Sequence, residues 1–115
     1  MDKPTSIERI NHILKAIRAI QNFMLDVDEE SFLNDIEKQS AVQFQFLIIG
    51  EAIKHIDISF LNNYKYPWHI PRSFRNFIIH EYHGIQMNRI YYAANDLFEL
   101  EAVLNTMLHD FSKAD

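Results

Sequence analysis

Apolar residues recur at intervals of three or four along most of this chain, which is the period of one face of an α-helix. The first such stretch predicts a helix over residues 6–25. Thr5 and Glu8 stand at the spacing of a capping box, which favours a helix start directly after Thr5. The residues at helical steps along this face are Ile7, Ile10, Leu14, Ile17, the polar Gln21, and Met24.

A second stretch repeats this spacing and predicts a long helix over residues 36–61. Gly50 lies inside it, at a position where glycine costs about 1 kcal/mol relative to alanine. We therefore interpret Gly50 as a place where another helix packs closely. Between the two long helices, residues 31–35 predict a short helical turn that is capped by Asp28 or Ser31.

The rest of the chain predicts a loop followed by two helices. The loop covers residues 62–70 and includes Trp68, which would either pack over the core or stack on a base. Pro71 suits the first turn of the next helix, and Gly84 is expected to end or bend that helix. A last apolar stripe predicts one continuous helix from residue 86 or 87 to residue 108.

We therefore predict a single all-α domain over residues 1–115, an up-and-down antiparallel helical bundle of four main helices plus one short helix. Apolar residues make up 48% of the chain, which is ample for a core. The chain has no cysteine, which excludes structural disulfides and cysteine-based zinc sites. The charged N-terminal residues and the short apolar runs lead us to expect no secretory signal, no membrane association and a cytoplasmic location.

The net charge of −5 is unevenly distributed along the chain. Residues 23–51 hold seven acidic residues against one lysine, whereas residues 54–92 hold five basic residues against two acidic ones. This local excess of positive charge fits a small phosphate-binding site better than a broad nucleic-acid-binding surface. Any affinity for nucleic acid should therefore be modest and sensitive to salt.

Residues 74–82 concentrate reactive side chains in the basic part of the chain. On a helix, Asn76 lies about 100° and His80 about 140° from Arg75, while Tyr82 returns to within about 20° of Arg75. The opposite arc of this helix is apolar. One face can therefore be buried in a core while the other presents polar groups to a cleft.

The polar face combines the groups that RNA cleavage without a metal requires. Arg75 offers a fork of donors that matches phosphate oxygens and could stabilise the charge that develops there. His80 could take the proton from a ribose 2′-hydroxyl or donate one to the leaving oxygen. Arg72 and His83 share the polar arc and are candidates for binding RNA phosphates. The alternative is that Arg75 is a surface or capping cation and His80 an ordinary hydrogen-bonded helix residue.

The pattern Arg75-x-x-x-x-His80-x-Tyr82, with Asn76 after the arginine, resembles the signature of the HepT-like branch of the HEPN superfamily. The resemblance extends over about residues 7–108. Gln86 is a departure, because the family often has an acidic residue two positions after the turn glycine. The flanking segments that carry the resemblance are Ile48-Ile49-Gly50-Glu51-Ala52, Tyr66-Pro67-Trp68, Gly84-Ile85 and Asn95-Asp96-Leu97-Phe98-Glu99-Leu100.

This resemblance implies a helical, usually dimeric ribonuclease toxin that acts on RNA, such as tRNA or mRNA, without a metal or cofactor. Arg75 and His80 would be catalytic and Asn76 would assist. Tyr82 would be the modification site, which a small nucleotidyltransferase antitoxin of the MNT type would AMPylate. A homodimer would bring two such helices together across a two-fold axis.

Two other interpretations use the same residues. In the first, the helix is part of a non-catalytic interaction module that binds a nucleotidyltransferase partner or a nucleotide phosphate, with Arg75 as the anchor. In the second, His80 and His83 bind a metal ion, and His69 or a distant carboxylate supplies the third ligand that a catalytic zinc needs. We expect no functional metal.

Overall fold

The first helix begins at the predicted capping box. In the computed structural model, which describes residues 5–81 and 84–113, helix α1 runs from Ser6 to Phe23. The backbone N–H of Glu8 donates to the Thr5 hydroxyl at 3.1 Å, and the Glu8 carboxylate accepts from the Thr5 N–H at 3.3 Å. The predicted start is therefore confirmed, and the helix ends two residues before its predicted end.

The described residues contain six further helices and no strand, which confirms the all-α class. The short α2 is capped by Asp28, whose carboxylate accepts from the Ser31 N–H at 2.8 Å. No helix among the described residues has the length and apolarity needed to cross a membrane. The helices are α2 (Glu29–Leu33), α3 (Ile36–Lys54), α4 (Ile58–Leu61), α5 (His69–His80), α6 (Met87–Ala94) and α7 (Phe98–Lys113).

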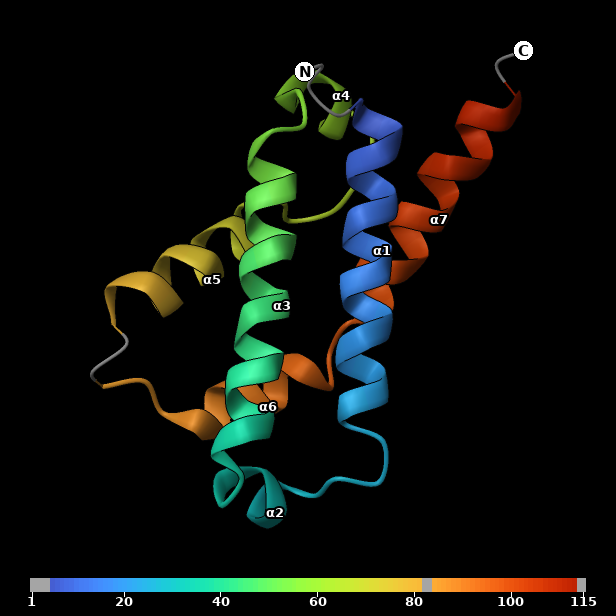
Figure 1. The fold of residues 1–115 in the computed structure, drawn as a ribbon. Helices are drawn as coiled ribbons and strands as arrows, with labels where there is room; N and C mark the ends of the chain where they lie inside the picture. Colours follow the sequence, from blue (N-terminus) through green and yellow to red (C-terminus); the bar gives the residue numbers. More distant parts are fainter. Residues whose placement is uncertain (1–4, 82–83, 114–115) are drawn as a thin grey trace.

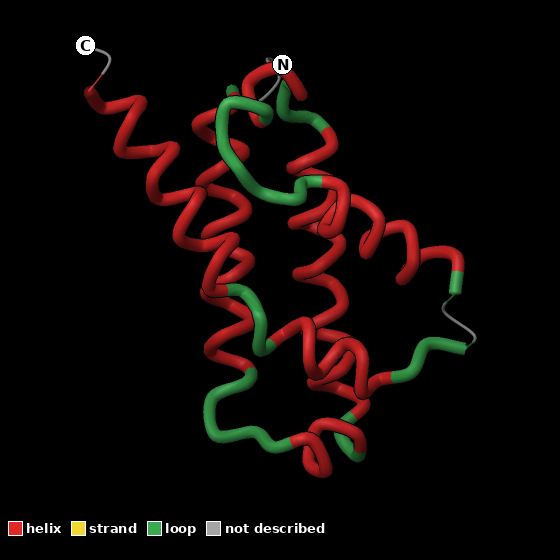
Figure 2. The backbone as a smooth tube through the Cα atoms, turned by 180° about the vertical axis from the view of Figure 1, so that it is seen from behind, coloured by secondary structure: helices red, strands yellow, loops and turns green. Residues whose placement is uncertain are grey.

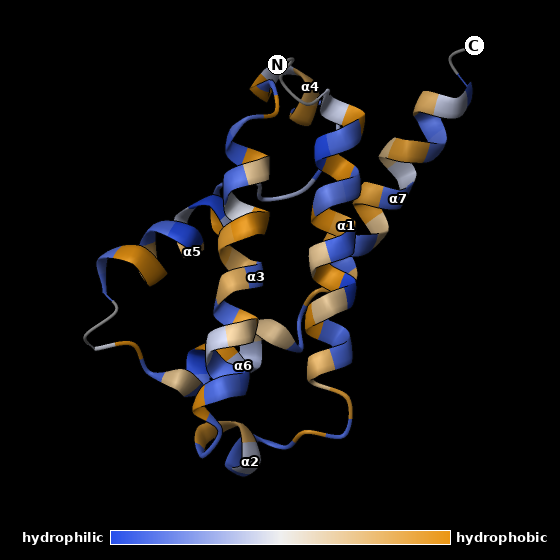
Figure 3. Cartoon of the chain, in the orientation of Figure 1, coloured by the Kyte–Doolittle hydropathy of each residue, from blue (hydrophilic) through white to orange (hydrophobic). Residues whose placement is uncertain are grey.

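Helices α1 and α3 lie antiparallel and side by side at the centre of the bundle (Figure 1). Helix α7 packs against α1, while α5 crosses α3 obliquely on the other side, as both views of the backbone show (Figures 1 and 2). Hydrophobic and hydrophilic residues alternate along α1 (Figure 3), as expected for a helix with one buried face. The core is built mainly from α1, α3 and α7, with Ile10, Ile13, Leu14, Ile17, Ile20, Ile49, Ile53, Leu104 and Met107 almost fully buried.

The prediction of one long helix to residue 61 is wrong, because α3 ends at Lys54 and a separate helix, α4, follows. The Asp57 carboxylate accepts hydrogen bonds from both the N–H and the hydroxyl of Ser59 at 2.9 Å and so starts α4. An aspartate that caps a new helix start competes with the continuation of the preceding helix. The apolar period continues across this break, so periodicity alone does not reveal it.

The prediction of one continuous last helix is also wrong, because α6 ends at Ala94 and α7 begins at Phe98. The side-chain amide of Asn95 donates to the carbonyl of Tyr91 at 2.9 Å, a local bond typical of a residue that ends a helix. The bundle therefore has four longer helices, α1, α3, α5 and α7, with three short ones in the described residues rather than one.

Trp68 is buried in the core at the start of α5. Its side chain is 4% exposed, and its indole N–H donates to the carbonyl of Leu61 at 2.9 Å. A buried indole whose donor is already satisfied cannot stack on a base, so the core-packing interpretation is the correct one. This contact fixes where α5 leaves the loop.

The end of α5 differs from the prediction. The helix ends at His80, with Glu81 as its C-cap, and Gly84 follows three residues later. Gly84 has no positive φ, and its N–H donates to the carbonyl of Glu81 at 2.9 Å. Gly84 is therefore part of a turn after the helix and does not itself end α5, as we had expected.

Gly50 is the point of closest approach between α3 and α5. A Cβ atom added to Gly50 would lie 2.3 Å from the Cβ of Arg75 and 3.1 Å from the carbonyl oxygen of Pro71. Both of these atoms belong to α5 and neither can move without its backbone. The interpretation of Gly50 as a close-packing residue is therefore confirmed, and the partner is the helix that carries Arg75.

Gly50→Ala is expected to lower the free energy of unfolding by about 1–3 kcal/mol, the usual cost of overpacking. This cost should exceed the gain of roughly 0.5–1 kcal/mol that alanine normally brings to a helix interior. Urea unfolding would measure the change. Gly84→Ala is the matched control, because a Cβ there would meet no atom within 4 Å, and it should change stability by less than about 0.5 kcal/mol. A Gly50→Ala protein as stable as the wild type would contradict the prediction.

Candidate functional site

Helix α5 carries the candidate residues on the side that faces α3 and solvent. Two edge-on aromatic rings, Phe46 of α3 and Phe74 of α5, anchor it with their centroids 4.9 Å apart. Ile78 is buried on the same apolar side. Toward its other end, the guanidinium of Arg89 lies 4.5 Å from the centre of the Phe77 ring, a cation–π contact that links α6 to α5.

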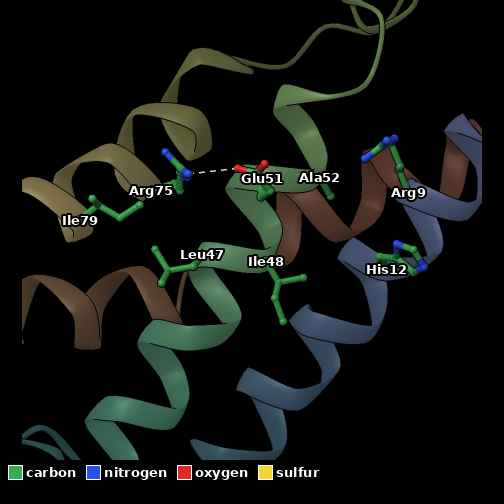
Figure 4. A pocket seen from close by; sticks show the side chains of 8 residues that line it. All are labelled: Arg9, His12, Leu47, Ile48, Glu51, Ala52, Arg75 and Ile79. Carbon is green, nitrogen blue, oxygen red and sulfur yellow. Dashed lines mark ion pairs between the residues drawn. The ribbon is translucent and has the colours of Figure 1, made fainter. Parts of the chain in front are cut away.

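Arg75 is held from two sides at the contact between α3 and α5. Its Nη2 lies 3.2 Å from Oε2 of Glu51 (Figure 4). Its Nη1 donates to the Oδ1 of Asn76 at 3.1 Å. The Arg75 side chain is 26% exposed. A guanidinium has five N–H donors, so donors remain for a ligand after these two contacts. Arg75 is thus oriented and still accessible.

The carboxylate of Glu51 connects Arg75 to His55. Its Oε1 lies 2.8 Å from the Nε2 of His55, and this hydrogen bond is the main cause that lowers the pKa of Glu51, against the opposing effect of burial. The charge of Arg75 lowers the pKa further. Oε2 has no hydrogen-bond partner among the described residues, although Arg75 is close, so that contact is electrostatic rather than directional. Glu51 therefore stays charged at neutral pH and fixes the position of Arg75.

A small hollow of about 100 Å³ opens beside Arg75, where α3 and α5 meet at Gly50. Lys54, Arg72 and Asn76 complete its lining. Three cationic side chains and an amide around a hollow of this size are suited to bind an anion such as a phosphate group. The structure thus brings together Arg72, Arg75 and Asn76, three of the residues that the sequence singled out.

His80 lies apart from this hollow. It is the last residue of α5 and is exposed, and its side chain makes no hydrogen bond or ion pair with another described residue. His80 lines neither this hollow nor a second hollow, between α1, α3 and α5, to which Arg75 also contributes. Tyr82 and His83 lie outside the described residues, so their predicted roles remain predictions.

Two residues of this site, Glu51 and Lys54, could line a cleft together with His55 on the sequence alone, although the sequence favours an ordinary polar face for them. Their helical spacing with His55 places all three on one side of α3, directly after Gly50. A polar face that follows a close-packing glycine is the signal that could have identified them. The described residues contain no group of three histidine or carboxylate side chains that could hold a metal ion, and His83 lies outside this search.

Comparison with known proteins gives a consistent result. The family described as "Ribonuclease HepT-like" matches residues 13–107. The chain is 33% identical over 98 residues to "Putative RNase MJ0127" of Methanocaldococcus jannaschii, covering 80% of this chain and 81% of that protein. It is 34% identical over 79 residues to "Probable ribonuclease HepT" of Thermococcus cleftensis, covering 68% of this chain and 72% of the relative.

A further relative is longer than this chain. "Gamma-glutamylcyclotransferase and putative RNase MJ0434" of M. jannaschii is 34% identical over 79 residues, which are 68% of this chain and 36% of that protein. No solved structure gives a significant match. The family match covers most of the helical bundle, including α3 and α5, which hold Arg75 in place. The chain therefore belongs to the HepT-like ribonuclease family.

Proposed function

We propose that this protein is a metal-independent endoribonuclease in which Arg75 and His80 are the catalytic residues. The observation that supports this most strongly is the fixed position of Arg75 at the edge of a cationic hollow, in a chain of the HepT-like ribonuclease family. The hollow matches the charge and size of one RNA phosphate. The substrate class that follows is RNA, such as tRNA or mRNA, and the activity would be cytoplasmic.

The proposed reaction is a transesterification within the RNA chain. The 2′-oxygen attacks the neighbouring phosphorus, the bond to the 5′-oxygen breaks, and the products carry a 2′,3′-cyclic phosphate and a 5′-hydroxyl. His80 takes the proton from the 2′-hydroxyl or gives one to the leaving 5′-oxygen. Arg75 binds the phosphoryl oxygens as negative charge develops on them, and Asn76 assists by orienting Arg75.

The separation of His80 from the hollow supports a homodimer as the active form. A second protomer related by a two-fold axis could bring its own α5 against the first. Ile79, next to His80 on α5, is an apolar side chain that is 39% exposed and available for such a contact. Pairing of the two helices would join two small basic surfaces into one groove long enough for RNA.

Regulation by a partner forms the second part of the proposal. We propose that the protein is the toxin of a toxin–antitoxin pair and that a nucleotidyltransferase antitoxin silences it by AMPylating Tyr82. The tyrosine oxygen would attack the α-phosphorus of ATP and pyrophosphate would leave. The attached AMP would add bulk and negative charge two residues after His80 and would repel RNA.

A second candidate function is a non-catalytic interaction module. It is favoured by the same separation, since Arg72, Arg75 and Lys54 could bind a phosphate with no proton-transfer group beside them. Such a module would bind a nucleotidyltransferase partner or a nucleotide without cleaving RNA.

RNA cleavage in EDTA separates these functions. Wild-type protein should cleave a panel of tRNA and mRNA, while Arg75→Ala and His80→Ala should each be slower by about 100-fold or more. Arg18→Ala and His109→Ala are matched controls on exposed positions of α1 and α7 and should retain full activity. Far-UV circular dichroism would verify that each variant is folded. Folded wild-type protein that is unmodified at Tyr82 and cleaves none of these RNAs would support the interaction module instead.

Intact-mass measurement tests the modification. Incubation with the nucleotidyltransferase partner and ATP should add one or more AMP units to the wild type and abolish RNA cleavage. Tyr82→Phe should gain no AMP, because it lacks the acceptor oxygen. Tyr92→Phe removes a different tyrosine, which is exposed, and should be modified like the wild type. AMP addition to Tyr82→Phe would show that the acceptor lies elsewhere.

A further inference from the structure

A second hollow, larger than the first, lies on the other side of Arg75. It has a volume of about 410 Å³ and opens between α1, α3 and α5 (Figure 4). Arg9 and His12 of α1 form one wall, and Arg75 and Ile79 of α5 form the other (Figure 4). Because Arg75 lines both hollows, the two are adjacent parts of one surface. We call this second hollow the α1–α5 groove.

The floor of the α1–α5 groove is apolar. It consists of Leu47, Ile48 and Ala52 of α3, and the first two are only partly buried. An apolar floor between cationic walls is complementary to a nucleotide, which has a flat base with little charge and a phosphate with full negative charge. Single-stranded nucleic acid is commonly bound in this way, by a positively charged groove that also contacts the faces of the bases.

The charges of the groove favour an anion despite the presence of Glu51. Among residues 5–81 and 84–113, Glu51 forms an ion pair with Arg75 and a hydrogen bond with His55, so Arg75 already offsets the charge of Glu51. Arg9 has no carboxylate partner in the same part of the chain. Its guanidinium is therefore available for an incoming phosphate, at the opposite wall from Arg75.

We propose that the α1–α5 groove binds a nucleotide of single-stranded RNA next to the cleaved phosphate, with Arg9 binding the phosphate and the base lying on Leu47 and Ile48. This inference rests on the proposed ribonuclease function and extends it to a substrate-binding subsite on α1. The RNA strand would run from the hollow at Lys54 and Arg72, over Arg75, to Arg9. His12 lies beside Arg9 and would contact the same nucleotide.

The test measures binding without cleavage. A labelled single-stranded RNA oligonucleotide would be titrated with His80→Ala protein, alone or combined with Arg9→Ala, over a series of salt concentrations. Arg9→Ala should raise the Kd about 5- to 10-fold and reduce the slope of log K against log salt by about 0.7, the value for one lost contact to a single-stranded phosphate. Arg18→Ala removes the same charge from an exposed position of α1 outside the groove, and its Kd should stay within about twofold.

Kinetics supply a second measurement in the active protein. Arg9→Ala should raise KM for a short RNA by a factor similar to its effect on the Kd and leave kcat unchanged, because Arg9 does not touch the reacting atoms. Arg75→Ala should lower kcat. A wild type that binds RNA without cleaving it would contradict the proposed function but not the groove, since the binding experiment does not depend on catalysis.

Two results would overturn the inference. The first is an Arg9→Ala protein that binds RNA with unchanged Kd and salt slope while Arg75→Ala binds more weakly. The second is a polyglutamate peptide that binds the wild type but not Arg9→Ala, with RNA binding equal in both. That outcome would assign the groove to an acidic protein partner instead of RNA.

Discussion

The close contact of α3 with α5 at Gly50 is the constraint on which the candidate site depends. Gly50 leaves no room for a side chain, because a Cβ there would lie 2.3 Å from the Cβ of Arg75. This approach brings the Arg75 side chain to the turn of α3 that carries Glu51 and Lys54. Aromatic packing between Phe46 of α3 and Phe74 of α5 stabilises the same crossing of the two helices. A larger residue at position 50 would separate the two helices, and with them the members of the site.

The position of Arg75 also explains how an acidic chain can offer a basic site. The net charge is −5, yet the two hollows beside Arg75 gather Lys54, Arg72 and Arg9 from three helices. Glu51 is the acidic residue between them, and its charge is offset by Arg75. Because such short-range charges dominate the field inside a small concave site, local arrangement matters more for phosphate binding than net charge does.

Local chemistry made much of the fold predictable. The capping box at Thr5 and Glu8 and the packing role of Gly50 follow from residues that act on their immediate neighbours. The breaks at Asp57 and Asn95 were missed because side-chain hydrogen bonds start α4 and end α6 there, without glycine or proline and without disturbing the apolar period. The place of Arg9 in the lining of the α1–α5 groove was not predictable, because it depends on how α1 packs against α3. Local periodicity carries no information on such long-range packing.

We propose that RNA cleavage depends on the position that the Gly50 contact gives to Arg75. The most direct test is the cleavage rate of Gly50→Ala protein, measured in EDTA at a temperature where circular dichroism shows it fully folded. This dependence on the Gly50 contact predicts a rate close to that of Arg75→Ala, because the added Cβ displaces the helix that carries the arginine. A folded Gly50→Ala protein that cleaves RNA at the wild-type rate would contradict it.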